Sequence, residues 1–266
     1  MFFKSKPIVF ISTLLALLSF NVQSTVVEIR TSLGVIEVNL FDNITPETVA
    51  NFLSYANAGA YADSVVHRSV SNFVIQGGGF TYTGPVAVNS FSLDSISTGT
   101  PVVNDPKLSN MRGTIAMAKT SNPDSATSQW FINLSNNANS LDVATNAGGF
   151  TVFGQVVGDG MQVVDAIADL TLLNGSGTFG ELPIRNYSQT DVDNEVQITD
   201  DNLVVIFDIV VTNMAADSAD NLNPTLNMLV NGPTGGSGSG SSGGGTMGWL
   251  LILGLVMLQK KRLLKR

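Results

Sequence analysis

Residues 66–80 read Val-His-Arg-Ser-Val-Ser-Asn-Phe-Val-Ile-Gln-Gly-Gly-Gly-Phe, and this stretch carries the most informative pattern of the chain. Two short apolar runs, Val65–Val66 and Phe73–Ile75, lie on either side of a polar segment that begins with His67-Arg68. The three glycines at 77–79 mark a place where the backbone turns tightly or another group approaches it closely. The pattern therefore predicts two short strands and a turn. It also predicts that one pocket receives three side chains: Arg68, Phe73 and Gln76.

Two later stretches share this mixture of apolar strand and polar side chains. Residues 112–134 contain Arg-Gly-Thr-Ile-Ala-Met-Ala and Ser-Gln-Trp-Phe-Ile, and residues 151–157 read Thr-Val-Phe-Gly-Gln-Val-Val. In this order the three stretches resemble the Phe-His-Arg…Gln-Gly-Gly, Gly-x-x-x-Met-Ala, Ser-Gln-Phe-Phe-Ile and Val-Phe-Gly-x-Val blocks of the cyclophilins, which are peptidyl-prolyl cis-trans isomerases. The residues in and around these blocks are most similar to those of bacterial periplasmic members, and the resemblance covers about residues 25–212.

The resemblance implies a mainly β fold, a closed eight-stranded antiparallel β-barrel capped by two α-helices. The residue pattern agrees with it. Residues 26–30 and 35–41 alternate apolar and polar side chains around a turn at 31–34, which predicts a hairpin. Thr45-Pro46-Glu47 predicts a helix start, and apolar side chains recur at helical spacing up to Gly59. A second helix is expected at 160–167, strands at 114–118, 129–134 and 151–157, a polar loop at 135–149, and a central closing strand at 203–211.

What the resemblance implies for the site is a proline pocket beside a catalytic arginine. Arg68 matches that arginine, and Gln76 and Gln129 match polar residues that orient it and contact the substrate. Ala118-Lys119-Thr120 matches the segment whose backbone pairs with the peptide. We therefore assign catalysis to Arg68, Phe73, Gln76, Gln129 and Phe131, and substrate binding to Val74, Ala118, Lys119, Thr120, Leu141 and Phe150.

This set of residues suits rotation about a peptide bond. The planar amide resists rotation by about 18–20 kcal/mol, and X-Pro bonds populate both isomers and exchange slowly. A catalyst must hold the proline ring and favour the twisted amide, whose nitrogen lone pair can accept a hydrogen bond. A fixed guanidinium can donate that bond. Such a mechanism needs no nucleophile, and we expect no cofactor and no metal.

Three positions depart from the family pattern. Ser140 stands where many members have the tryptophan that is associated with tight cyclosporin binding, so weak sensitivity to that drug is expected. Lys119 replaces a frequent asparagine, and Phe150 replaces a frequent histidine. His67, the one histidine of the chain, should point away from Arg68 because neighbouring side chains of a strand take opposite faces. We interpret it as structural.

Composition and charge narrow the possible functions. The chain has no cysteine, which excludes disulfides and thiolate metal sites. Seven of its 13 basic residues lie at the two ends, so the middle carries a net charge of about −15 and should repel nucleic acid. Acidic residues gather at 191–201. A calcium site there is conceivable, but the spacing fits no metal loop, and a solvated acidic loop is the simpler interpretation.

The two ends predict export. Residues 1–24 have a basic start, a short apolar run and small residues near Ser24, which is typical of a secretory signal peptide. An N-terminal membrane anchor is the alternative. Residues 25–212 form the predicted isomerase domain, and 213–245 a polar linker rich in Gly and Ser. Residues 246–266 are apolar and then basic, which resembles a glycine-glycine sorting signal processed by a rhombosortase. A permanent inner-membrane anchor is the alternative.

Two functions remain open from the sequence. The first is a peptidyl-prolyl cis-trans isomerase that helps exported, proline-containing proteins to fold in the periplasm or cell envelope. The second is a non-catalytic module, or chaperone, that binds proline segments. The complete pocket set favours the enzyme, acting as a monomer.

Overall fold

The computed structural model describes residues 25–173, 179–213 and 222–231. The predicted signal peptide and the predicted C-terminal anchor or sorting signal lie outside the described residues. Within the described ranges, no helix is both long and apolar enough to cross a membrane.

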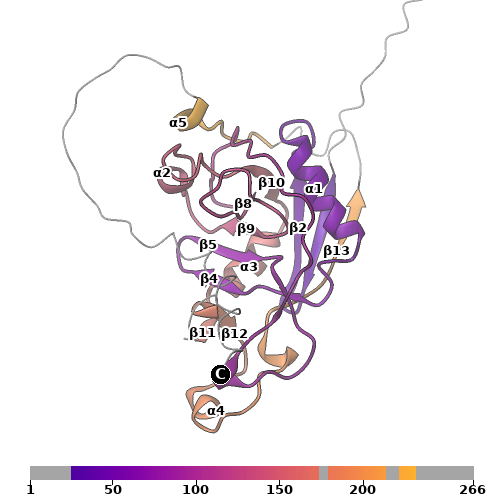
Figure 1. The fold of residues 1–266 in the computed structure, drawn as a ribbon, viewed down its shortest axis with the longest axis vertical. Coiled ribbons are helices and arrows are strands. Elements are labelled where there is room, and N and C mark those ends of the chain that lie inside the picture. The colour runs from indigo at the N-terminus through magenta and orange to yellow at the C-terminus, as the bar shows by residue number, and fades with distance from the viewer. Residues whose placement is uncertain (1–24, 174–178, 214–221, 232–266) are drawn as a thin grey trace, which may run out of the picture.

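One curled sheet of eleven strands organises the structure (Figure 1). From one edge to the other it runs β4 (Arg68–Val70), β5 (Val74–Gly77), β9 (Trp130–Asn133), β8 (Thr114–Met117), β10 (Val152–Val156), β2 (Gly34–Leu40), β1 (Val26–Thr31), β13 (Val205–Asn213), β3 (Ser64–Val65), β6 (Phe80–Thr81) and β7 (Asp94–Ser95). Every pairing in this sheet is antiparallel. A separate hairpin pairs β11 (Thr171–Leu173) with β12 (Leu182–Ile184).

The mainly β prediction is confirmed, but the sheet is not the expected set of eight strands. Its strand order has two edges, β4 and β7, and closure into an eight-stranded barrel stays a prediction. The chain between β3 and β4 joins distant parts of the sheet. There the amide of Val66 donates to Val204 O (3.0 Å), and the amide of His67 donates to Gln76 O (3.0 Å).

Two helices cover the sheet as predicted. The helix α1 (Pro46–Asn57) packs against β13, and α3 (Gly160–Ala168) lies against β2, β4 and β5 (Figure 1). The hairpin strands bury Ile36, Val38 and Leu40, because alternation places these side chains on one face. Thr45 precedes α1, yet its hydroxyl donates to Val152 O (3.3 Å) and makes no cap bond to the helix.

Short helices and 3₁₀ turns lie in the chain outside the strands and the two main helices. They are α2 (Ala138–Leu141), α4 (Gln189–Asp193), α5 (Met228–Asn231) and the 3₁₀ turns at Val88–Ser90 and Asp200–Asn202. The helix α2 lies inside the stretch that the sequence predicts as a polar loop. No periodic pattern announces it, because it is a single turn.

The glycine run after β5 permits a close approach, as its sequence predicts. A Cβ on Gly77 would lie 2.9 Å from the ring of Trp130, and one on Gly79 would lie 2.8 Å from Gln129 Cδ. Gly78 has a φ of +74°, a conformation that favours glycine. The run therefore lets β5 end directly over Trp130 and Gln129, and this packing sets the position of the Gln129 side chain.

Candidate active site

The register of four strands places three of the five predicted catalytic residues in one row. Arg68 of β4 pairs with Gln76 of β5, Gln76 pairs with Phe131 of β9, and Phe131 pairs with Ala116 of β8. Residues directly opposite each other in an antiparallel sheet project to the same face. Arg68, Gln76 and Phe131 therefore share a face, as the sequence predicts.

Glu181 holds the guanidinium of Arg68. The Arg68 Nε donates to Glu181 Oε2 at 2.7 Å, and the amide of Ser69 donates to Glu181 O at 2.8 Å. The arginine side chain is 22% exposed. The prediction gave the orienting role to the glutamines, and it missed Glu181 because no local pattern links this residue to Arg68. Within the described residues the two terminal nitrogens of Arg68 make no hydrogen bond.

The two glutamines bind each other. Gln76 Nε2 donates to Gln129 Oε1 at 2.8 Å, and the Gln76 side chain is buried. An amide that both donates and accepts can present its remaining groups to a peptide backbone. The pair lies beside the Arg68 position on the sheet and fixes the polar edge of the site.

An apolar cluster forms the rest of the site, and we call it the pocket cluster. Phe131 and Phe150 meet edge to face, with ring centroids 5.8 Å apart. The amide of Phe150 donates to Leu141 O at 2.9 Å, which ties the two pocket residues together. The buried members are Phe41, Val74, Leu108, Ala116, Phe131, Leu141, Phe150 and Val152, with Ile44, Phe73, Ala118 and Leu222 packed against them. Six predicted pocket residues thus lie together: Phe73, Val74, Ala118, Phe131, Leu141 and Phe150.

Lys119 and Thr120 lie at the rim of this cluster. The Lys119 ammonium donates to Ala147 O at 2.6 Å and lies 4.3 Å from the centroid of the Phe150 ring, a cation–π contact. Burial lowers the pKa of Lys119 to about 8. Thr120 is exposed, and both its amide and its hydroxyl bind Ser125 Oγ. The structure therefore brings Lys119 to the pocket wall and leaves Thr120 outside the cluster.

His67 directly precedes β4, and its burial contrasts with the partly exposed side chain of Arg68. Its ring is fully buried and meets Phe80 edge on at 4.9 Å. Burial lowers the pKa of His67 to about 4, against the opposing effect of the polar groups of Val65 and Gln129. Neither ring nitrogen makes a well-formed hydrogen bond within the described residues. A neutral, enclosed imidazole of this kind cannot act as a surface acid or base.

A buried polar network lies behind the pocket cluster, and no sequence motif predicted it. Its centre is Asp142, whose carboxylate accepts hydrogen bonds from Ser109 Oγ (2.5 Å), Asn110 N (2.9 Å) and Asn110 Nδ2 (2.9 Å). The same Asn110 amide donates to Phe150 O at 3.2 Å. A carboxylate that is 1% exposed needs such donors to offset its loss of hydration.

The acidic stretch at 191–201 forms turns of its own. Asp191 accepts bonds from the amide and hydroxyl of Ser188, and these bonds lower its pKa. Asp200 begins a 3₁₀ turn. Among the described residues there is no group of three or more His, Cys, Asp or Glu side chains that could hold a metal ion.

Comparisons with known proteins agree with this geometry. The family model for cyclophilin type peptidyl-prolyl cis-trans isomerase/CLD matches residues 26–189. A peptidyl-prolyl cis-trans isomerase of Acinetobacter baylyi is 44% identical over 149 residues, which cover 55% of this chain and 73% of that protein. Peptidyl-prolyl cis-trans isomerase A of Dickeya dadantii is 42% identical over 169 residues, covering 61% and 83%. Peptidyl-prolyl cis-trans isomerase B of Escherichia coli K12 is 41% identical over 145 residues, covering 53% and 82%.

These matches and this site define an enzyme of proline isomerisation. The chain belongs to the cyclophilin-type peptidyl-prolyl cis-trans isomerase family. Its reaction is therefore the cis-trans isomerisation of X-Pro peptide bonds.

Proposed function

We propose that Arg68 is the catalytic residue and that it acts on proline-containing segments of exported proteins. The assignment of Arg68 rests on one observation, which is that its guanidinium is held in place by Glu181. Glu181 holds the Nε side of the fork, and the two terminal nitrogens face no partner among the described residues. A preorganised donor of this kind needs little reorganisation when the amide twists.

The division of labour follows from the neighbours of Arg68. The pocket cluster receives the proline ring, and burial of that apolar ring fixes the substrate. The Gln76–Gln129 pair binds the flanking backbone. As the C–N bond twists, its nitrogen lone pair becomes localised, and the arginine donates to it. Because this bond is made mainly in the transition state, it accelerates rotation in both directions.

Export is supported by the environment of Thr25, the first residue after the predicted signal peptide. Thr25 is 5% exposed, its amide donates to Asp42 Oδ2 (2.8 Å), and its hydroxyl donates to Asp42 Oδ1 (2.9 Å). A chain cleaved after Ser24 would present an ammonium group to this carboxylate, which strengthens the pair. We propose that the mature enzyme begins at Thr25 and works, as a monomer, in the periplasm or cell envelope.

The proposal for the C-terminal end rests on sequence alone. A Gly-rich linker, an apolar segment and a basic end support sorting by a rhombosortase-type protease, with transient anchoring in the inner membrane. Mass spectrometry of the envelope form tests this: a chain that ends near residues 235–245 supports sorting, and an intact Arg266 supports a permanent anchor.

An isomerisation assay on an X-Pro peptide tests the catalytic proposal. We expect the full chain to accelerate isomerisation, and Arg68→Ala to remove most of that acceleration while the peptide still binds. Near-normal turnover by Arg68→Ala would overturn the assignment.

A further inference from the structure

Residues 222–231 form a strap that lies against the isomerase body, although they fall inside the predicted linker. The amide of Ser109 donates to Thr225 O at 2.8 Å, and the amide of Asn227 donates to Lys107 O at 2.9 Å. Between these bonds, Leu226 pairs with Leu108 in an antiparallel bridge. Figure 1 shows the strap ending in α5 near α2, at the end of the molecule opposite α4.

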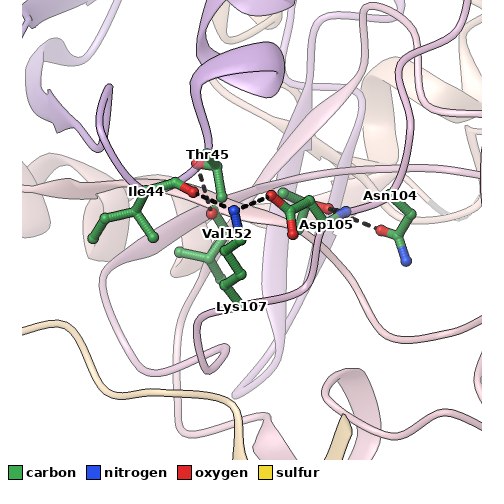
Figure 2. Close-up of polar contacts among 7 residues, drawn as sticks. Ile44, Thr45, Asn104, Asp105, Lys107 and Val152 are labelled. Atoms are coloured by element: carbon green, nitrogen blue, oxygen red, sulfur yellow. Dashed lines mark hydrogen bonds and ion pairs between the residues drawn. The ribbon is translucent and has the colours of Figure 1, made fainter. Parts of the chain in front are cut away.

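The loop that receives the strap is itself held firmly. Lys107 Nζ donates to Ile44 O (3.0 Å) and pairs with Asp105 (2.7 Å), and the amide of Asp105 donates to Thr151 Oγ1 (2.7 Å). Figure 2 shows these contacts converging on the segment 104–107. The strap therefore pairs with a loop segment, residues 104–109, that has several contacts of its own with the isomerase body.

Asn227 is buried, although it lies between exposed residues of the strap. Its side chain is 1% exposed, whereas its neighbours Leu226 and Met228 are 63% and 61% exposed. Asn227 Nδ2 donates to Asp142 O at 3.1 Å, and Asn227 Oδ1 accepts from the amide of Leu229 at 3.0 Å. A side-chain amide that is buried while its apolar neighbours in the chain are exposed indicates a specific hydrogen-bond partner. Here that partner is Asp142, the residue next to Leu141.

The polar network behind the pocket cluster extends this contact to three pocket residues. Asp142 follows Leu141 directly, and Asn110 joins Asp142 to Phe150 O. The network continues through Asn133 and Asn137, and Asn137 Nδ2 donates to Phe73 O at 2.8 Å. The strap also adds Leu222 to the apolar residues packed against the pocket cluster. Leu141, Phe150 and Phe73 thus share one support.

We propose that the strap is part of the isomerase site and that Asn227 is a positioning residue for the proline pocket. By binding the carbonyl of Asp142, it fixes the corner that carries Leu141 and, through Asn110, the backbone of Phe150. This inference rests on the proposed function, because it assumes that Leu141 and Phe150 line the pocket.

The test compares full-chain variants in an isomerisation assay that separates kcat from KM. Asn227→Ala removes the bonds to Asp142 O and from the Leu229 amide. Asn227→Leu keeps a side chain of similar size, adds no charge and removes the donor to Asp142. We expect both to raise KM for an X-Pro peptide by about tenfold, the change that loss of one buried hydrogen bond brings, with kcat nearly unchanged. Leu226→Ser, next in the chain and exposed, is the matched control and should keep the normal KM.

Leu141→Ala separates a failure of this inference from a failure of the pocket assignment. A raised KM in Leu141→Ala with a normal KM in both Asn227 variants overturns the positioning role. A normal KM in Leu141→Ala overturns the pocket assignment itself. A lower melting temperature without a change in KM in the Asn227 variants means that the strap only stabilises the fold, and this also overturns the inference. If Asn227→Ala does not fold, Asn227→Leu decides.

Discussion

Arg68 Nε lies 2.7 Å from Glu181 Oε2, although 113 residues separate the two along the chain. A second bond, from the Ser69 amide to Glu181 O, links β4, which carries Arg68, to Glu181, which directly precedes β12. This contact supports the proposal that Arg68 is a preorganised donor.

Replacing Arg68 should affect turnover far more than stability. We expect Arg68→Ala to lower kcat/KM by about a hundred- to a thousandfold, as loss of a transition-state donor does in oxyanion sites. The Arg68–Glu181 pair is partly exposed, so its loss should cost about 1 kcal/mol of folding free energy or less. Arg68→Lys should rescue poorly, because an ammonium lacks the planar fork. Rate, melting temperature and peptide affinity are measured together on both variants.

Glu181 should act through the arginine. We expect Glu181→Ala to lower kcat by about tenfold with little change in KM, since the Nε side of the fork loses its hydrogen bond while the pocket cluster stays intact. Glu181→Gln keeps an acceptor for Nε and should retain more activity than the alanine variant. Asp165→Asn is the control, because it removes the carboxylate of another arginine pair, Arg112–Asp165, away from the site. Equal kcat values for Glu181→Ala and the unmutated enzyme would contradict a positioning role.

The local pattern was sufficient to predict much of the fold. Alternation and helical spacing predict the hairpin, α1 and α3 to within a few residues. The glycine run predicts a close approach of other groups, and Trp130 and Gln129 make it. The number of strands was harder, because β3, β6 and β7 have only two residues each and show no periodicity.

The site was predictable where a motif carried it. Arg68, Gln76, Gln129 and the aromatic residues stand in such motifs, and the structure brings them together. Glu181, Asp142 and Asn227 stand in none. Each is defined by a contact with a residue at least 32 positions away, and single polar residues in loops carry no sign of such partners. Thr120 shows the converse, because the motif included it and its own turn directs it to Ser125.

Cyclosporin A should inhibit the enzyme weakly. Ser140 replaces a large indole with a small hydroxyl group, which removes apolar contact area and an N–H donor. We expect Ser140→Trp to tighten binding of the drug, measured as inhibition of isomerisation, while turnover of a small peptide stays close to normal. Ser140→Ala is the matched control and should bind no more tightly than the unmutated protein. Nanomolar inhibition of the unmutated enzyme is the result that the proposal cannot accommodate.

The stability of the enzyme should fall in mild acid because of His67. Its pKa in the folded protein, about 4, lies below the ordinary value of 6.5, so the unfolded chain takes up a proton that the folded chain refuses. Stability from this group is complete above pH 6.5 and is lost as the pH falls towards 4, by on the order of 3 kcal/mol in all. Urea unfolding at several pH values measures this.

His67→Leu provides the comparison for that experiment. Because the chain has one histidine, the difference in unfolding free energy between the enzyme and this variant isolates its titration. The difference should change steadily between pH 6.5 and 4.5. A constant difference over that interval would show that the imidazole is not buried in its neutral form.

The pair formed by Thr25 and Asp42 gives a test of export that does not depend on activity. Mass spectrometry of the enzyme from the cell envelope should find Thr25 as the first residue. In that form the Thr25 nitrogen is an ammonium bound to a carboxylate, and bonds of charged groups contribute about 1.5–3 kcal/mol, roughly twice the usual value. Asp42→Asn should therefore destabilise the mature enzyme more than a chain that retains residues before Thr25.

The control is again Asp165→Asn, whose partly exposed pair with Arg112 should contribute less than about 1 kcal/mol in both forms. Equal effects of Asp42→Asn on both forms would mean that the pair is an ordinary amide bond and gives no support to cleavage before Thr25. A first residue other than Thr25 would refute the predicted cleavage site directly.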